Sequence, residues 1–255
     1  MSGERGLSGG RTGGAVRVGE TVRRPAGAWT PAVHALLTHL EDAGFDGAPA
    51  ARGIDEQGRE ILTLLPGETV GDERPWPPWT HSDETLWQVA QWLREYHAAV
   101  AGFVPPEGAV WRKGGAWEPG LIIGHNDAAP CNAHYADGRL TGFAGWDFAG
   151  PVTVEADLAF TAFAWVPLSA REVAAAEGFT AFGDRSRRLR LLLDAYGWRG
   201  DSSQIVREAR DRVSASIHDI RRLAMAGDPG CQQLIEAGYD LELATAVKEL
   251  ATFPR

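Results

Sequence analysis

The stretch that decides the fold of this chain is Leu121–Leu158, LIIGHNDAAPCNAHYADGRLTGFAGWDFAGPVTVEADL. It opens with a short apolar run that is typical of a buried strand, and Gly124 ends this run. The dipeptide Asp-Gly at 137–138 stands between two strand-like segments and predicts a hairpin turn. The stretch therefore predicts a strand, a polar loop, and a hairpin whose second strand leads towards Asp147.

Three polar residues follow the first predicted strand, and Asn132 comes five positions after Asp127. Phosphoryl transfer needs such a pattern, because one Asp accepts the proton of the attacking hydroxyl while an Asn and a later Asp hold the metal. Protein kinases have the same spacing, with a His two positions before the Asp, as His125 stands here. The pattern predicts Asp127 as the general base and Asn132 as a metal ligand.

The whole chain resembles the aminoglycoside phosphotransferase and choline kinase-like family, small-molecule kinases on a protein-kinase-like fold. The resemblance rests on H-N-D at 125–127, on Asn132, on the hairpin, and on Asp157-Leu158. It implies an α+β, two-lobe fold with a small antiparallel-sheet N-lobe in residues 1–66 and a larger, mainly helical C-lobe in residues 67–255. It also implies ATP or GTP and Mg²⁺ as cofactors, and a hydroxyl of a small molecule as the phosphoryl acceptor.

One position departs from the family's pattern. The family has its metal-binding Asp directly after the second hairpin strand, whereas this chain has Gly145 there. Asp147 follows two residues later and shares a side with position 145 if the strand continues. We therefore expect Asp147 to replace the missing metal ligand. The alternative is a degenerate kinase-fold protein, which either only binds its ligands or uses the cleft for a reaction other than phosphoryl transfer.

The expected nucleotide contacts lie near the start of the chain, where strands are predicted at 15–18, 21–24 and 60–65. Gly9 and Gly10 precede the first strand, and their backbone N–H groups either cradle phosphates or belong to a flexible loop. By the resemblance, Arg23 contacts the nucleotide phosphates while Arg24 faces the other way. The alternative is that both are solvated arginines of an edge strand.

The resemblance also implies a hinge after the third of these strands. Leu64 and Leu65 end that strand, and in the resembled fold the hinge backbone binds adenine. A helix predicted to begin near residue 30 corresponds to the kinase helix whose Glu pairs with a strand Lys. Its first two turns hold no Glu, so that ion pair is absent or made differently, and His34 is expected to be a surface or packing residue.

Several other polar residues are expected to be structural. His125 should shape the catalytic loop through hydrogen bonds more than act chemically, and His97 should be a satisfied histidine at the edge of the core. The basic run 185–190 is expected to be a solvated helix face. Residues 231–252 are expected to hold a final helical pattern.

Composition narrows the functional classes further. The chain has 255 residues, and its net charge of -9 argues against non-specific nucleic-acid binding while it is compatible with a cationic substrate. Cys131 and Cys231 make neither a disulfide framework nor a zinc site, which favours a cytoplasmic location. The first ten residues do not resemble a signal peptide, and the longest apolar stretch, 158–168, is too short to span a membrane.

Overall fold

The structure is a computed structural model, which describes residues 4–6, 14–71 and 74–253. Its contacts divide the chain into two compact units. Unit 1 comprises residues 1–72 and 91–157, and unit 2 comprises residues 73–90 and 158–255. The lobe boundary predicted after residue 66 stays a prediction.

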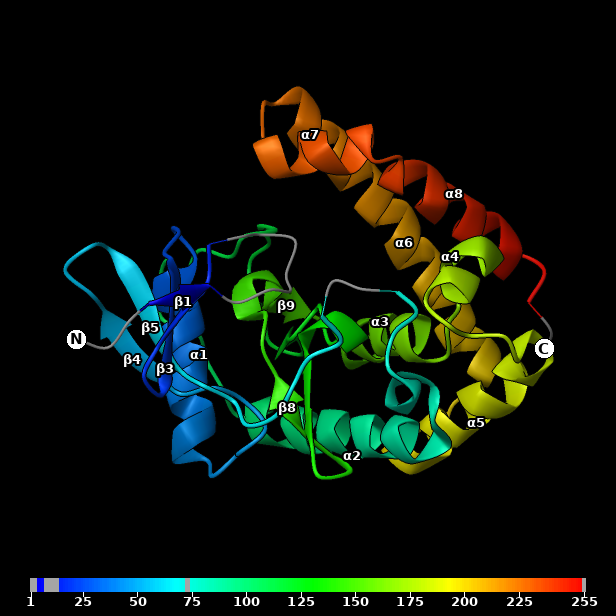
Figure 1. Ribbon diagram of the computed structural model, residues 1–255, viewed down its shortest axis with the longest axis horizontal. Coiled ribbons are helices and arrows are strands. Elements are labelled where there is room, and N and C mark those ends of the chain that lie inside the picture. Colours follow the sequence, from blue (N-terminus) through cyan, green and yellow to red (C-terminus); the bar gives the residue numbers. More distant parts are fainter. Residues whose placement is uncertain (1–3, 7–13, 72–73, 254–255) are drawn as a thin grey trace. The chain divides into compact units, whose positions relative to one another are not determined.

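Unit 1 opens with a five-stranded antiparallel sheet in the order β1-β2-β3-β5-β4 (Figure 1). The strands are β1 Arg5–Gly6, β2 Val16–Val18, β3 Thr21–Pro25, β4 Ala51–Ile54 and β5 Arg59–Thr63. In the β3–β5 register, Arg23 lies opposite Ile61 and Arg24 lies opposite Glu60. The predicted strands are confirmed, and the register sets which arginine shares a face of the sheet with Glu60.

Helix α1 Thr30–Asp42 contacts β4 and supplies part of the core of unit 1. Its buried residues Val33, Leu36, Leu37 and Leu40 recur at the spacing of one helix face. The second half of α2 Asp83–Val100 belongs to the same unit and buries Leu93 and Tyr96 completely.

The stretch Leu121–Leu158 contains two small antiparallel sheets, both within unit 1. One pairs β6 Ile122–Gly124 with β9 Gly150–Val152, and the other is the hairpin of β7 Ala133–Ala136 and β8 Arg139–Phe143. Asp137 and Gly138 link the hairpin strands with φ of 50° and 79°. Two consecutive positive φ values are what a tight hairpin turn with the natural strand twist requires, so the predicted hairpin is confirmed.

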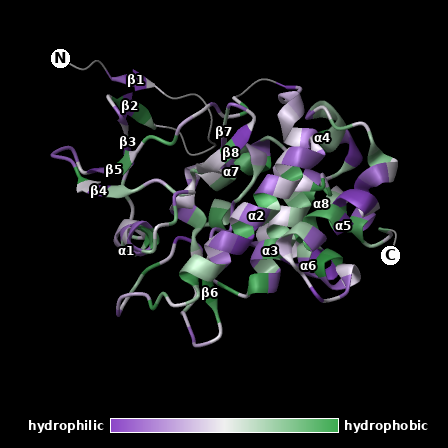
Figure 2. Ribbon diagram, turned by 90° about the horizontal axis from the view of Figure 1, so that it is seen from below, coloured by the Kyte–Doolittle hydropathy of each residue, from purple (hydrophilic) through white to green (hydrophobic). Residues whose placement is uncertain are grey.

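Unit 2 is helical, and Figure 2 shows hydrophobic and hydrophilic residues on the same helices. Its helices are α3 Val154–Trp165, which enters the unit at residue 158, α4 Arg171–Ala176, α5 Arg185–Tyr196, α6 Ser202–Met225, α7 Pro229–Glu236 and α8 Tyr239–Leu250. Val213, Ile217 and Leu243 form a cluster between α6 and α8. The final helical pattern is interrupted at Gly238, whose φ of 74° is incompatible with a continuous helix.

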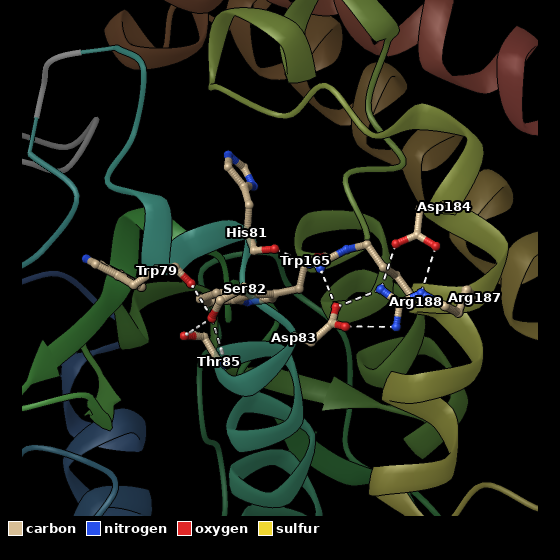
Figure 3. Close-up of polar contacts among 9 residues, drawn as sticks. All are labelled: Trp79, His81, Ser82, Asp83, Thr85, Trp165, Asp184, Arg187 and Arg188. Carbon is tan, nitrogen blue, oxygen red and sulfur yellow. Dashed lines mark hydrogen bonds and ion pairs between the residues drawn. The ribbon is translucent and has the colours of Figure 1, made fainter.

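The basic run of α5 differs from its predicted role as a solvated face. Arg188 is 2% exposed, and its guanidinium donates to the carbonyl oxygens of His81 and Trp165 and to Asp83 (Figure 3). Arg187 bonds the same Asp83, and this contact lowers the pKa of that carboxyl. The prediction was wrong for Arg188 and for Arg185, which is 7% exposed, because their partners come from distant segments that helix periodicity does not reveal.

Within the described ranges, the helices are too short or too polar for any of them to cross a membrane.

Candidate active site

The loop that carries the predicted base is held at its start by Asp157. This fully buried carboxylate accepts hydrogen bonds from the backbone N–H groups of His125 (3.1 Å) and Asn126 (2.9 Å). His97 adds a contact of 3.1 Å through Nε2, which confirms it as a satisfied histidine. A Cβ on Gly124 would lie 2.8 Å from the Asp157 carboxyl carbon. The strand therefore ends in a glycine because both the Val152 side chain, which lies still closer to such a Cβ, and the carboxylate approach the backbone closely.

His125 is fully buried, and both of its ring nitrogens face the backbone. The N–H of Asp127 donates to Nδ1 at 3.2 Å, so Nδ1 is an acceptor and Nε2 carries the proton. Nε2 lies 3.0 Å from the carbonyl oxygen of Ala144, which can only accept. Burial lowers the pKa of His125 to about 4. This neutral ring joins the loop to the end of β8, in agreement with its predicted role in shaping the loop.

Asp127 and Asn132 lie together, as their spacing predicted. The Nδ2 group of Asn132 is 2.8 Å from Oδ2 of Asp127 and 2.8 Å from its backbone oxygen. A short 3₁₀ turn, Pro130–Asn132, brings the amide back onto the carboxylate. Asp127 is half-buried, so its carboxylate is oriented by a neutral donor and stays near the surface. This arrangement suits a group that accepts a proton.

The space beside the Cα atom of Gly145 is filled by the side chain of Asn132. The φ of Gly145 is 77°, and a Cβ at this position would lie 2.6 Å from Cγ and Oδ1 of Asn132. The Asn132 side chain thus fills the space where a side chain of residue 145 would begin. Because a non-glycine residue also pays for a positive φ, a carboxylate at this position requires the Asn132 side chain to move and adds backbone strain.

Asp147 does not continue strand β8, which ends at Phe143. It lies on a 3₁₀ turn, Trp146–Phe148, so the alternation of side chains along a strand does not apply to it. The carboxylate is 8% exposed and is surrounded by donors. Oδ1 accepts from Nε1 of Trp29 at 3.1 Å, while Oδ2 pairs with Arg24 and lies 3.5 Å from Nη1 of Arg112.

The sequence did not show how this chain replaces the ion pair between the strand Lys and the helix Glu of protein kinases. Arg24 takes part in the pair that stands at this place. Its Nε lies 2.8 Å from Oε1 of Glu60, and Nε2 of His34 lies 3.1 Å from Oε2 of the same carboxylate. Glu60 is 3% exposed. A Glu on strand β5 therefore bridges strand β3 and helix α1, where protein kinases use a helix Glu. His34 has a specific partner, which its predicted role as a surface or packing residue did not include.

The other predicted nucleotide contacts stay predictions. Arg23 faces away from Arg24 and contacts Asp55 at 3.7 Å and the hydroxyl of Thr21 at 2.6 Å. Leu64 follows β5 and bonds the carbonyl oxygen of Glu20 through its backbone N–H, and Leu65 is buried. Gly9 and Gly10 lie outside the described residues.

The side chains predicted to bind magnesium do not fit that ion as they stand. Magnesium requires several hard oxygen ligands in near-octahedral geometry. Residue 145 offers no side-chain oxygen, and both oxygens of Asp147 accept from cationic or N–H donors. Across residues 4–6, 14–71 and 74–253, no three His, Cys, Asp or Glu side chains gather closely enough to hold a metal. Metal binding by Asn132 and Asp147 stays a prediction.

Sequence reasoning missed three residues of this site: Arg112, Trp29 and Glu60. Arg112 lies in the Gly- and Pro-rich segment before β6, where no periodicity identifies a contact. Trp29 directly precedes α1, and its indole N–H is the part that bonds Asp147. Glu60 could have been predicted from the sequence. An antiparallel pairing of the two predicted strands places Arg24 opposite Glu60.

A comparison with curated proteins finds a relative of this chain by sequence. The chain is 37% identical over 199 residues to the trifolitoxin immunity protein of Rhizobium leguminosarum bv. trifolii, which covers 75% of this chain and 73% of that protein. No family model matches the chain.

Solved structures share the fold at low sequence identity. The complex of gentamicin with APH(2")-IIa has a TM-score of 0.58 at 14% identity and covers 100% of this chain and 92% of that one. A choline/ethanolamine kinase family protein from Mesorhizobium loti has a TM-score of 0.54 at 14% identity and covers 97% and 92%. The GDP complex of aminoglycoside 2'-phosphotransferase-IIIa has a TM-score of 0.54 at 15% identity and covers 98% and 92%. These similarities confirm the predicted α+β, protein-kinase-like two-lobe fold.

Proposed function

Because this chain belongs to the family of the trifolitoxin immunity protein and has the protein-kinase-like fold of small-molecule phosphotransferases, we propose that it is an ATP- or GTP-dependent phosphotransferase. The acceptor is a hydroxyl group of a small, toxin-like molecule. The name of the relative makes trifolitoxin the first candidate acceptor. The net charge of -9 favours a cationic molecule among small acceptors.

The observation that carries this proposal is the geometry of the Asp127–Asn132 loop. The carboxylate of Asp127 is half-buried and is oriented by a hydrogen bond of 2.8 Å from Asn132. Two further anchors fix the loop, namely the His125 ring and the buried Asp157. A base on a rigid loop stays within reach of a bound hydroxyl, and correct positioning supplies much of the rate in phosphoryl transfer.

In the proposed step, the acceptor hydroxyl oxygen forms a bond to the γ-phosphorus of the nucleotide. The bond from that phosphorus to the β–γ bridging oxygen breaks, so that the nucleoside diphosphate leaves with the electron pair. The hydroxyl proton passes to a carboxylate oxygen of Asp127. Arg23 and the Gly9-Gly10 segment are proposed to contact phosphates, and the backbone of Leu64 and Leu65 to contact the base. The use of magnesium is not part of the step, because the side chains near Asp147 do not fit the ion.

The test is a transfer assay with the purified chain. It is incubated with trifolitoxin and ATP or GTP, with and without Mg²⁺, and the toxin is examined by mass spectrometry for an added phosphoryl group. We expect one added group in the complete mixture and none when the nucleotide is omitted. Nucleotide binding without any modified toxin would contradict the proposal.

A second candidate function is toxin binding without phosphoryl transfer. The observation that favours it is Gly145, where the expected metal ligand is missing and its space is filled by Asn132. In this second function the chain protects by holding the toxin. The two functions separate in trifolitoxin-sensitive cells that express the chain or its Asp127→Asn variant. Equal protection by both proteins favours binding, whereas loss of protection in the variant favours transfer.

A further inference from the structure

We propose that unit 2 contains a binding site for a small organic anion, in a cavity between α5, the start of α6 and the end of α8. Helix α6 packs against both other helices within this unit (Figure 1). The ligand carries a phosphate or carboxylate head and a short apolar tail. The inference goes beyond the proposed function, because it rests on contacts within unit 2 alone.

The cavity has a cationic side and an apolar side. The residues of the cationic side come from the first three turns of α6 and are Ser202, Ser203, Arg207 and Arg210. The residues of the apolar side are Leu189, Val206, Leu250, Ala251 and Phe253. In the part of the chain that the structure describes, no acidic residue lines the cavity. Such a lining fits an anion that also has an apolar part.

The charge of Arg207 is available to a ligand. Ser203, Arg207 and Arg210 follow one another at spacings of four and three residues, so they share one face of α6. The Arg207 guanidinium donates to Oγ of Ser203 at 2.8 Å, and this hydroxyl donates to Asp201 at 2.8 Å. A neutral hydroxyl therefore orients Arg207, which forms no ion pair within the described ranges. Arg210 has only a contact of 3.5 Å with Asp211.

The start of α6 favours the same sign of charge as the two arginines. The first four N–H groups of a helix have no acceptor within it, and together they carry a partial positive charge. Asp201 caps the helix and accepts from the backbone N–H of Ser203 at 2.9 Å. Ser202 stands at the first helical position, where its N–H points out of the helix end. An oxyanion beside Ser202 and Arg207 can therefore accept from both kinds of donor.

The apolar side determines the rest of the ligand. Leu189 and Leu250 are 3% and 4% exposed, and Phe253 beside them is half-buried. Apolar surface at a cavity favours a ligand that covers it and removes it from water. The volume of about 130 Å³ lies below the roughly 300–1,000 Å³ of pockets for drug-sized molecules. The ligand is therefore compact, with one ring or a short chain attached to its anionic head.

The experiment is isothermal titration calorimetry with phenyl phosphate and benzoate, which carry the two candidate heads on the same ring. Phenol and inorganic phosphate are the matched halves, because one lacks the anionic head and the other lacks the tail. No nucleotide, magnesium or toxin is present, so the outcome does not depend on the proposed function.

The proteins are the unmodified chain, Arg207→Gln, the double variant Arg207→Gln/Arg210→Gln, and Phe253→Ala. Arg190→Gln is the matched control, since it removes the same charge from an exposed position of α5 that does not line the cavity. Circular dichroism establishes that each variant is folded. If Arg207→Gln does not fold, Arg207→Lys replaces it, because it keeps the charge and loses the two-donor fork of the guanidinium.

We expect saturable binding of phenyl phosphate or benzoate, and weaker binding of phenol and inorganic phosphate. Arg207→Gln should weaken binding about tenfold or more, as is usual for the loss of a charge-assisted hydrogen bond. Arg190→Gln should change binding less than about twofold, because an exposed charge outside the cavity is screened. Phe253→Ala should weaken binding of phenyl phosphate and leave that of inorganic phosphate unchanged. The tighter of the two ring compounds identifies the head group.

Three results overturn the inference. The first is the absence of saturable binding of both ring compounds up to about 10 mM. The second is equal affinity of the unmodified chain and the double variant, which means that the anion binds elsewhere. The third is binding of phenol as tight as that of phenyl phosphate, which means that the cavity selects the ring and not the charge.

Discussion

The loop 125–132 and the turn 146–148 are the two halves of the candidate site, and each contains one aspartate whose partners make it chemically different from the other. In the loop of residues 125–132, Asp127 is half-buried and accepts a hydrogen bond from a neutral amide. In the turn of residues 146–148, Asp147 is buried among two arginines and an indole N–H. The first carboxylate is oriented but still able to accept a proton, whereas the second is already neutralised by its partners. The charge of a side chain therefore does not decide its role, and the donors around it do.

The largest effect is expected at the first carboxylate. Asp127→Asn should lower phosphoryl transfer by about 10²–10⁴-fold, because it removes a general base. The free energy of unfolding should change by less than about 1 kcal/mol, since the amide of Asn132 can still donate to an oxygen at position 127. Transfer is measured with the toxin assay and stability by urea denaturation. Unchanged transfer would remove Asp127 from the mechanism.

The second carboxylate should matter for stability instead. Asp147→Asn leaves Arg24 and Arg112 with one negative charge fewer, and we expect a loss of about 3 kcal/mol in the free energy of unfolding, as for other broken buried ion pairs. Urea denaturation measures this loss. Asp137→Asn is the matched control, because it makes the same change at an exposed hairpin position and should be nearly neutral. Equal effects of both substitutions would show that the Asp147 cluster is not stabilising.

The loop half has a pH dependence of its own, which comes from His125. Its pKa is lowered by burial from 6.5 to about 4, so the unfolded chain takes up a proton at a pH where the folded chain does not. Stability from this group is therefore complete above pH 6.5 and is lost as the pH falls towards 4. The loss at pH 5 is roughly 2 kcal/mol. Urea denaturation at pH 7 and pH 5 should show this loss in the unmodified chain and not in His125→Asn, and equal losses in both would contradict the assignment.

The smallest expected change in stability comes from the close approach of Asn132, in the loop, to Gly145, just before the turn. Gly145→Ala should cost about 1 kcal/mol more than Gly138→Ala, because both pay for a positive φ but only the Cβ at 145 meets Asn132. No described atom lies within 4 Å of a Cβ at Gly138. Urea denaturation measures the difference. In an Asn132→Ala background it should disappear, and a difference that persists would show that Asn132 is not the source of the crowding.

Local patterns predicted what is local in this structure. The Asp-Gly turn and the apolar periodicity of α1 each depend on neighbours in the chain, and both are confirmed. The protein-kinase-like fold followed from the resemblance of residues 121–158 to a known family.

Contacts between distant segments were not predictable in the same way. Tertiary packing brings Arg112, from the loop before β6, to Asp147. It also brings the carbonyl oxygens of His81 and Trp165 to Arg188 in unit 2. The expectation for Asp147 also assumed that strand β8 continues, whereas Gly145 takes a left-handed conformation and a 3₁₀ turn follows. A residue with positive φ thus changes the direction of the side chains that directly follow it. Hydrophobic patterns do not reveal such a residue.

The contact between Gly145 and Asn132 also affects how this site can evolve. A single base change converts a glycine codon into an aspartate codon, so the carboxylate that Gly145 lacks is one mutation away. In this backbone, however, the new Cβ would meet the Asn132 side chain at 2.6 Å and would sit at a positive φ. A variant with aspartate at this position would therefore be less stable until a second mutation moves Asn132 or reshapes the turn. Selection acts on the first step before the second has occurred, so the crowding at position 145 opposes the gain of an acidic residue there.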